Sequence, residues 1–398
     1  MAQLPLSRYL DCCATTPMAP EVAERMAAVQ AEAWANPSSL HGFGLAAAEQ
    51  LERSRQGLAD LLGCTTERLV FTSGGSESIH LALLGSAAAL EAAMPSAESP
   101  RLLVSAVEHP ATRAACAVLQ QRGWQVVELP VDPWAALDLD ALARWLRPPT
   151  RLVSLIWGQS EVGTMQPLQR IGALCRQAGV LLHVDAVQVL GHQRIAMAEL
   201  PVDLLSLAAH KIQGPRGIGA LVLRQGLTLQ PCIGGGGQEG GMRAGTEPVA
   251  LAAGFETALA LCATRLERNG GVDPVAALRD ALLGRLLCLP GLDLSGPDPR
   301  ESSHPDRLPH HLSLVVRSHA GAWLNGRQLV QALWREGFAC SSGSACSSSG
   351  SAASSVLRAM GYEQEAAGAG LRISLGPWHG PELLEQFPDA LERARAAL

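Results

Sequence analysis

Short apolar runs alternate with amphipathic stretches between residues 65 and 225. Nearly every position in the apolar runs is hydrophobic, which is typical of parallel strands covered on both faces. These runs predict strands at Arg68–Ser73, Leu102–Val107, Trp124–Leu129, Arg151–Trp157, Val180–Asp185, Leu204–Ala208 and Gly219–Leu223. The stretches between them predict helices at Glu77–Ala93, Thr112–Arg122 and Pro167–Gly179. The alternation indicates an α/β domain around a mostly parallel, seven-stranded sheet.

The pattern changes after residue 250. Ala250–Arg268 predicts a long helix that leaves the large domain, and a polar stretch with Gly and Pro follows at Asn269–Pro274. The later elements are smaller: strands at His311–Val316 and Gly370–Leu375, helices at Gln328–Glu336 and Pro381–Ala397, and a surface loop at Ser295–Pro309. We predict a large α/β domain over residues 14–260. Residues 1–13 and 261–398 would form a smaller α+β domain.

Composition excludes several classes of protein. The 398 residues are 47% apolar and 17% charged, which rules out global disorder, and the net charge of −6 argues against a nucleic-acid-binding surface. No export signal and no apolar stretch of about 18 residues is visible, so we expect no membrane partner. The ten cysteines are scattered without a C-x-x-C pair. This predicts free thiols in a reducing cytoplasm and no metal site.

Only one of the 31 basic residues is a lysine, Lys211. Arginine replaces lysine where charge alone matters, but a guanidinium does not form a Schiff base as a deprotonated amine does. The count alone fits a surface lysine that survived by chance equally well. The neighbouring residues must therefore decide between the two interpretations.

An acidic strand end precedes Lys211. The strand at Val180–Asp185 ends in Asp185, and 26 residues later another apolar strand leads into His210 and Lys211. Ligands of open α/β sheets bind at the carboxyl ends of strands. A lysine and an aspartate at neighbouring strand ends suit pyridoxal phosphate, because the lysine forms the Schiff base and the aspartate keeps the pyridine nitrogen protonated. The alternative for Asp185 is a helix N-cap.

Two further segments fit this cofactor. Thr72–Ser78, T-S-G-G-S-E-S, lies between a strand and a helix, where successive backbone N–H groups bind phosphate. Such turns are common, so this segment alone is weak evidence for phosphate binding. Lys211 and Asp185, which follow it in the sequence, strengthen that interpretation. His109 follows the strand at Leu102–Val107 and is placed to lie over a planar ring, although it could be an ordinary loop histidine.

These segments, with others, resemble the cysteine desulfurase family, in the class V aminotransferase-like group of fold-type I pyridoxal phosphate enzymes. The resemblance runs nearly from end to end. The matching motifs are Tyr9–Asp11, Ala14–Pro17, Asn36–Ser38, the T-S-G-G-S-E-S turn, Glu108–His109, H-V-D-A-V-Q, His210–Gly217, Gly235–Thr246, Ser341–Cys346 and Arg372–Gly376.

The resemblance implies a role for each matching residue. Lys211 would be the Schiff-base lysine, Asp185 would pair with the pyridine nitrogen, Gln188 would reach the phenolic oxygen and His109 would stack on the ring. Three residues of the same chain would hold the phosphate: Gly75, Ser76 and His210. Thr246 would add a contact from the partner subunit of a homodimer. The substrate, L-cysteine, would be bound by Asn36 and Arg372, the latter through its carboxylate.

Cys346 would carry the chemistry that distinguishes the family. It lies in the Ser/Gly-rich sequence S-S-G-S-A-C-S-S-S-G-S, which suits a thiolate that moves between substrate and acceptor. The family would convert L-cysteine to L-alanine, leave a persulfide on this cysteine and pass the sulfur to an acceptor or scaffold protein for iron–sulfur cluster or thio-cofactor synthesis. The alternative is a buried, inert cysteine. We interpret Cys12 and Cys13 as packing residues, and Cys340 as a core residue at a strand end.

Four residues, at three places in the sequence, depart from the family pattern. Ser160 replaces an asparagine that contacts cofactor and substrate, Ala208 replaces a serine that donates to the phosphate, and Ile79-His80 replaces Asp-Asn. These changes leave open a related cysteine or selenocysteine lyase, an aminotransferase, or a degenerate paralogue without catalysis.

Overall fold

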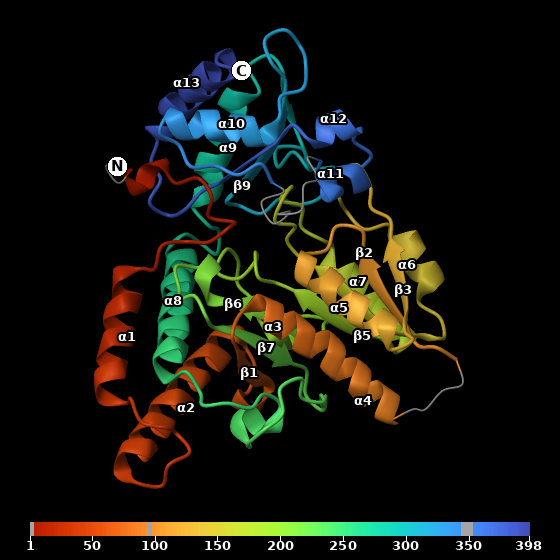
Figure 1. Ribbon diagram of the computed structural model, residues 1–398, viewed down its shortest axis with the longest axis vertical. Coiled ribbons are helices and arrows are strands. Elements are labelled where there is room, and N and C mark those ends of the chain that lie inside the picture. Colours follow the sequence, from red (N-terminus) through yellow and green to blue (C-terminus); the bar gives the residue numbers. More distant parts are fainter. Residues whose placement is uncertain (1–3, 94–97, 344–352) are drawn as a thin grey trace.

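Two β-sheets organise the chain, one of seven strands and one of three (Figure 1). The computed structural model describes residues 4–93, 98–343 and 353–398. The strands are β1 (Leu69–Thr72), β2 (Arg101–Ser105), β3 (Gln125–Leu129), β4 (Thr150–Ile156), β5 (Leu181–Asp185), β6 (Leu204–Ala208), β7 (Gly219–Leu223), β8 (Leu292–Leu294), β9 (His311–Val316) and β10 (Gly370–Ser374).

The large sheet has the strand order β1-β7-β6-β5-β4-β2-β3. Its strands from β6 to β3 pair in parallel, and β7 pairs antiparallel with both β6 and β1. This confirms the predicted mostly parallel, seven-stranded sheet, with each predicted strand displaced by at most two residues at either end.

Helices cover both faces of this sheet. They are α1 (Pro20–Glu32), α2 (Gly42–Leu62), α3 (Gly75–His80), α4 (Ser86–Ala93), α5 (Pro110–Gln121), α6 (Leu139–Trp145), α7 (Leu168–Ala178) and α8 (Val249–Arg268), with a π-helical turn at Leu81–Gly85 between α3 and α4. Leu103 packs in the same core as α2, α7 and α8, whereas Leu102 and Val104 pack against α5. The alternation follows from the two-residue period of a strand and explains why nearly every strand position is apolar.

Helix α8 is long and apolar enough to span a membrane, contrary to the expectation that no such stretch exists. Half of its most apolar window is buried, and the helix packs against α1 and α2. Core helices of this kind pass the same test of length and composition as membrane spans.

The three-stranded sheet has the order β10-β9-β8, with antiparallel pairing throughout. Its helices are α9 (Val275–Leu286), α10 (Gly326–Arg335), α11 (Ser355–Ala359), α12 (Gln364–Ala367) and α13 (Leu383–Ala396). The residues before α1, 4–19, are called the N-terminal arm. Leu10 of this arm is buried in the core around the three-stranded sheet. The domain boundaries at residues 13/14 and 260/261 stay a prediction.

A buried ion pair fixes the glycine-rich loop that follows β7. Arg55 of α2 donates from both Nη atoms to the two carboxylate oxygens of Glu239, each at 2.8 Å. Glu239 also accepts from the backbone N–H of Phe71 on β1 at 2.8 Å, and Arg55 donates to the carbonyl of Leu69 at 2.8 Å. The pair therefore ties a helix, an edge strand and the loop that leads to Thr246.

The substitution Glu239→Gln should lower the free energy of unfolding by about 3–5 kcal/mol, because it removes the buried counter-ion of Arg55 and leaves only the exposed Glu52. Urea-induced unfolding measures the change. Glu52→Gln is the matched control, since Glu52 also pairs with Arg55 but is mostly exposed; it should change little. Equal effects of the two substitutions would contradict this account.

Candidate active site

The predicted cofactor residues converge at the carboxyl end of the large sheet. Strand β5 ends in Asp185, strand β6 continues into a short 3₁₀ turn at Ala209–Lys211, and helix α3 begins at Gly75. Strands β5 and β6 are parallel neighbours, so their carboxyl ends lie at the same edge of the sheet. This is where open α/β sheets bind their ligands.

Lys211 is held by the N-terminal arm. Its Nζ donates to the carbonyl oxygens of Cys13 at 2.5 Å and Ala14 at 2.8 Å. Its charge acts on the surrounding groups, since it lowers the pKa of Asp185, His109 and His210. The one lysine of the sequence therefore lies among the predicted cofactor residues and is not an isolated surface residue.

Asp185 is buried at the strand end. Burial raises the pKa of its carboxyl group, and the charges of His109 and Lys211 together with a hydrogen bond from the Val187 N–H oppose that rise. That N–H lies 3.0 Å from Oδ1, so the aspartate does bond the backbone two residues on, as the capping alternative expects. The hydrogen bond occupies one carboxylate oxygen, and the other suits a protonated ring nitrogen.

His109 is the N-cap of α5. Its Nδ1 accepts from the backbone N–H of Ala111 at 3.2 Å, which assigns the ring proton to Nε2. Burial lowers the pKa of His109, and Lys211 lowers it further, while Asp185 raises it. A neutral ring at this position suits stacking on a planar cofactor.

The turn before α3 has the geometry of a phosphate cradle. Gly74 has φ 152°, and a Cβ on Gly75 would lie 2.9 Å from Cγ2 of Val187. Glycine is therefore required where the turn passes over the end of β5. Ser76 is exposed in the first helical turn, where backbone N–H groups lack helical partners.

His210 and Gln188 also lie at this edge. His210 Nδ1 lies 3.1 Å from Thr15 Oγ1, and burial, helped by Lys211 and Arg216, lowers the pKa of its imidazole to about 4. Gln188 Nε2 donates to the Cys13 carbonyl at 2.9 Å, so one oxygen accepts from both Gln188 and Lys211.

Arg372 lies on β10, in the second sheet, and is buried. Its Nη2 donates to Asp11 Oδ1 at 2.8 Å and its Nη1 to the Ser160 carbonyl at 3.1 Å. Burial opposes its charge, but Cys13, Asp11 and Glu161 outweigh this and raise its pKa. Its Nε–H is buried and has no partner within the described residues. The guanidinium therefore keeps a donor for a substrate carboxylate.

Asn36 and Thr246 lie on the surface of the single chain. Asn36 Oδ1 accepts from Ser38 N at 2.9 Å in its own loop. Cys346 lies outside the described residues, so its predicted role stays a prediction. The neighbouring prediction for Cys340, a core residue, is confirmed by its burial in the second core.

Cys12 and Cys13 are both buried, as packing residues would be. Cys13 contributes more than packing, because its carbonyl accepts from Lys211 and its Sγ lies 3.3 Å from His310 Nε2. The sequence signal was its position beside the Tyr9–Asp11 motif. Ser160 is one of the residues that depart from the family pattern. Its backbone carbonyl accepts a hydrogen bond from Arg372.

Glu161 is a second residue that the sequence did not single out. Its carboxyl group is buried, and Oε1 has no hydrogen-bond partner among the described residues. Burial raises its pKa, which a hydrogen bond from Ser354 and the charge of Arg372 oppose. A Cβ on Gly343 would lie 2.8 Å from Cγ of Glu161. Glu161 therefore touches both described ends of the segment that contains Cys346.

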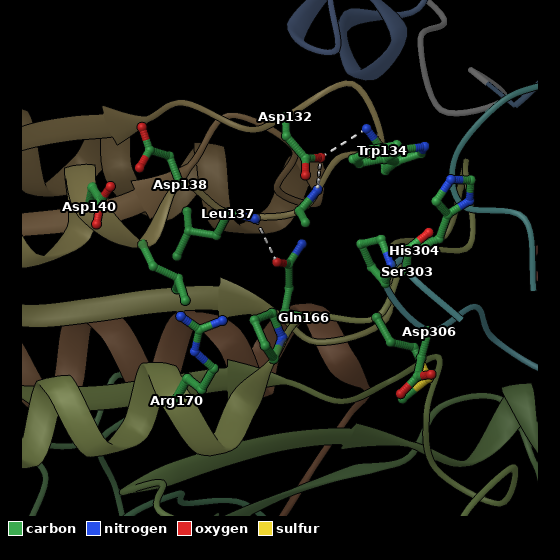
Figure 2. A pocket seen from close by; sticks show the side chains of 15 residues that line it. Asp132, Trp134, Leu137, Asp138, Asp140, Gln166, Arg170, Ser303, His304 and Asp306 are labelled. Carbon is green, nitrogen blue, oxygen red and sulfur yellow. Dashed lines mark hydrogen bonds between the residues drawn. The ribbon is translucent and has the colours of Figure 1, made fainter. Parts of the chain in front are cut away.

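A separate cleft of about 550 Å³ lies between the loop after β3, the start of α7 and residues 303–306 (Figure 2). Trp134 and His304 contact each other there with ring centroids 4.7 Å apart. None of the predicted site residues lines this cleft.

The comparisons with known proteins agree with this geometry. Residues 8–387 match the family model "Aminotransferase class-V". The chain belongs to this family, and within it to the cysteine desulfurases. It is 36% identical to the cysteine desulfurase IscS of Dictyoglomus turgidum (97% of this chain, 93% of the relative) and 39% identical to a cysteine desulfurase of Cereibacter sphaeroides (98% and 96%).

Solved structures give the same result. A "NIFS-LIKE PROTEIN" superposes with a TM-score of 0.87 at 30% identity, covering 98% of this chain and 99% of that one. "SspA in complex with cysteine" superposes with a TM-score of 0.79 at 28% identity, covering 94% and 100%. The resemblance drawn from the motifs and the fold-type I architecture are thereby confirmed.

Cysteine desulfurases of this family depend on pyridoxal phosphate, and the residues present fit that group. Lys211 supplies the amine, Asp185 a buried acceptor, His109 a neutral ring, and Gly74-Gly75 a turn that a side chain would fill. In the described part of the chain, no group of three metal-ligating side chains comes together.

Lys211→Arg should give a folded protein that lacks the visible absorbance of a covalently held cofactor. The arginine keeps the charge next to the Cys13 carbonyl but does not act as the amine nucleophile. Alanine formation from cysteine should fall by roughly 100- to 10,000-fold or more. Arg224→Lys, at an exposed site, is the control and should change neither readout; an absorbing, active Lys211→Arg would refute the assignment.

Proposed function

We propose that this cysteine desulfurase converts L-cysteine to L-alanine and collects the sulfur as a persulfide on Cys346. The observation that carries the proposal is that the N-terminal arm joins Lys211, at the same sheet edge as Asp185, to Arg372 of the second sheet, since Cys13 accepts from Lys211 and Asp11 pairs with Arg372. Lys211, Asp185 and Arg372 supply an amine, a buried carboxyl group and a guanidinium whose Nε–H has no partner among the described residues. An α-amino acid offers a matching amine and carboxylate.

Arg372 binds the substrate carboxylate and so orients the amino acid, and the Asp11 contact fixes the guanidinium in place. Bound pyridoxal phosphate supplies an electron sink for the α-carbon. Asp185 would hold a proton at the ring nitrogen, and this positive charge would favour the uptake of electrons by the ring. Lys211, once its amine is free, accepts the α-proton; the Cys13 and Ala14 carbonyls lie within hydrogen-bond reach of its Nζ.

The sulfur step needs no external oxidant. The Cys346 thiolate attacks the substrate Sγ, the substrate Cβ–Sγ bond breaks, and a new S–S bond forms on Cys346. The electron pair of the broken bond stays with the carbon skeleton, which takes up protons at Cβ and Cα and leaves as alanine. The outer sulfur of the persulfide then passes to an acceptor or scaffold protein, and it supplies iron–sulfur cluster or thio-cofactor synthesis in the cytoplasm.

Cys346→Ala should abolish persulfide formation while the visible absorbance of the bound cofactor is kept. The reason is that the thiol accepts sulfur but does not hold the cofactor. Sulfane sulfur and alanine are measured with L-cysteine as substrate, and Cys288→Ala, at an exposed cysteine, is the control. Normal rates of both products from Cys346→Ala would remove Cys346 from the mechanism, whereas pyruvate and ammonia from the unmodified chain would indicate a lyase.

The proposal includes a homodimer in which Thr246 reaches the phosphate of the partner subunit. Its exposure on the single chain supports this, as does the ion pair that fixes the loop leading to it. Mixing and refolding Lys211→Ala with Thr246→Arg should restore roughly a quarter of the unmodified activity. Half of the dimers are then mixed, and each mixed dimer has one intact site of two. No recovery in dimers verified by sedimentation would place Thr246 in its own subunit's site.

A further inference from the structure

Four buried polar side chains form a continuous row across the large sheet, just before the strand ends that hold the cofactor residues. Ser154 Oγ lies 2.8 Å from His183 Nδ1, and His183 Nε2 lies 2.9 Å from Ser206 Oγ. Ser206 Oγ lies 2.8 Å from Ser78 Oγ, which is 2.9 Å from the Ala220 carbonyl oxygen. All four side chains are completely buried. Solvent therefore does not replace any of these hydrogen bonds.

The last two bonds of the row share one donor. Ser78 Oγ is the donor both to the Ala220 carbonyl and to Ser206 Oγ, so its one hydrogen lies between two acceptors. His183 bonds a serine hydroxyl at each of its ring nitrogens. A neutral imidazole donates at one of these nitrogens and accepts at the other, so it pairs with both serines.

This arrangement needs a neutral imidazole at His183. Burial lowers the pKa of His183 to about 3, so the neutral form is the one present near pH 7. The row is consequently a chain of hydrogen bonds between uncharged side chains near pH 7.

The row joins the three elements that carry the cofactor residues. His183 precedes Asp185 by two residues on β5 and so shares its face of the sheet. Ser206 on β6 is the register partner of Asp185 and precedes Lys211 by five residues. Ser78 lies in the first turn of α3, three residues after Gly75, and that turn packs on Val187.

We propose that His183 and Ser206 are positioning residues for the cofactor, which hold Asp185, the Lys211 strand and the phosphate turn of α3 in one fixed arrangement through this hydrogen-bonded row. The inference rests on the family's use of pyridoxal phosphate and adds residues that touch neither cofactor nor substrate. It predicts that the His183–Ser206–Ser78 part of the row matters for cofactor binding, and that the Ser154 end matters much less.

The row contains its own matched control. Ser154→Ala and Ser206→Ala each remove one completely buried hydroxyl and each leave one nitrogen of His183 unpaired. They differ in which hydrogen bond of His183 is lost: Ser154→Ala removes the bond at Nδ1, and Ser206→Ala removes the bond at Nε2. Ser154 lies on β4, which carries none of the proposed cofactor residues, whereas Ser206 leads to Ser78 and the phosphate turn.

The experiment titrates the cofactor-free form of each full-length variant with pyridoxal phosphate and follows the visible absorbance. Ser206→Ala should bind about tenfold or more weakly than the unmodified protein, and Ser154→Ala less than about threefold more weakly. Thermal unfolding of the cofactor-free forms is measured alongside, and the two variants should be destabilised to a similar extent. Ser78→Ala removes the hydrogen bond between Ser78 and Ser206, and it should weaken cofactor binding as Ser206→Ala does. If Ser206→Ala does not fold, Ser78→Ala takes its place in the experiment.

Equal cofactor affinities for Ser154→Ala and Ser206→Ala would overturn the inference, because the row would then contribute general core stability and no positioning. Unchanged affinity in both Ser206→Ala and Ser78→Ala would overturn it as well. These readouts do not depend on Cys346 or on alanine formation. A failure of the proposed sulfur transfer is therefore distinguishable from a failure of this inference.

Discussion

The carbonyl oxygen of Cys13 is the point on which the site depends. It accepts from Lys211 and Gln188, which follow strands β6 and β5 of the large sheet, while the N–H of the same residue donates to Ser374 Oγ on β10 of the second sheet at 2.8 Å. Other residues of the N-terminal arm also contact both sheets. Asp11 pairs with Arg372 of the second sheet, and the Thr16 N–H donates to the carbonyl of His210, beside Lys211, at 2.9 Å. One short stretch of backbone thus sets the distance between Lys211, the proposed Schiff-base lysine, and Arg372, the arginine proposed to bind the substrate.

Burial governs the charges around this point. Desolvation lowers the pKa of His109, His183 and His210 and raises that of Asp185. The histidines near the cofactor edge are therefore neutral near pH 7. Among the described residues, Lys211, Arg216 and Arg372 place positive charge near this edge. The Lys211 amine suits an aldehyde once it has lost a proton, and the Arg372 guanidinium suits a carboxylate.

Much of the fold, and the clustering of the candidate cofactor residues at one sheet edge, could be predicted from the sequence, because continuous apolar strands and the residues at their ends carry a strong signal. The helices α1 and α2 escaped prediction because α2 contains three glycines and both are polar over much of their length. The part played by Cys13 could not be predicted, since it acts through backbone atoms that every residue has. Glu161 escaped because its surroundings come from residues 343 and 354, far away in the sequence. Asn36 and Thr246 are surface residues of the single chain, so their predicted roles stay predictions.

The placement of the single lysine has a practical consequence for studying this protein. Every other basic side chain of the sequence is a guanidinium or an imidazole, so an aldehyde reagent finds one side-chain amine, and that amine lies at the sheet edge beside Asp185. Reductive trapping with sodium borohydride would therefore label one side chain per polypeptide. The mass added to the chain would count occupied sites directly, without a correction for surface lysines.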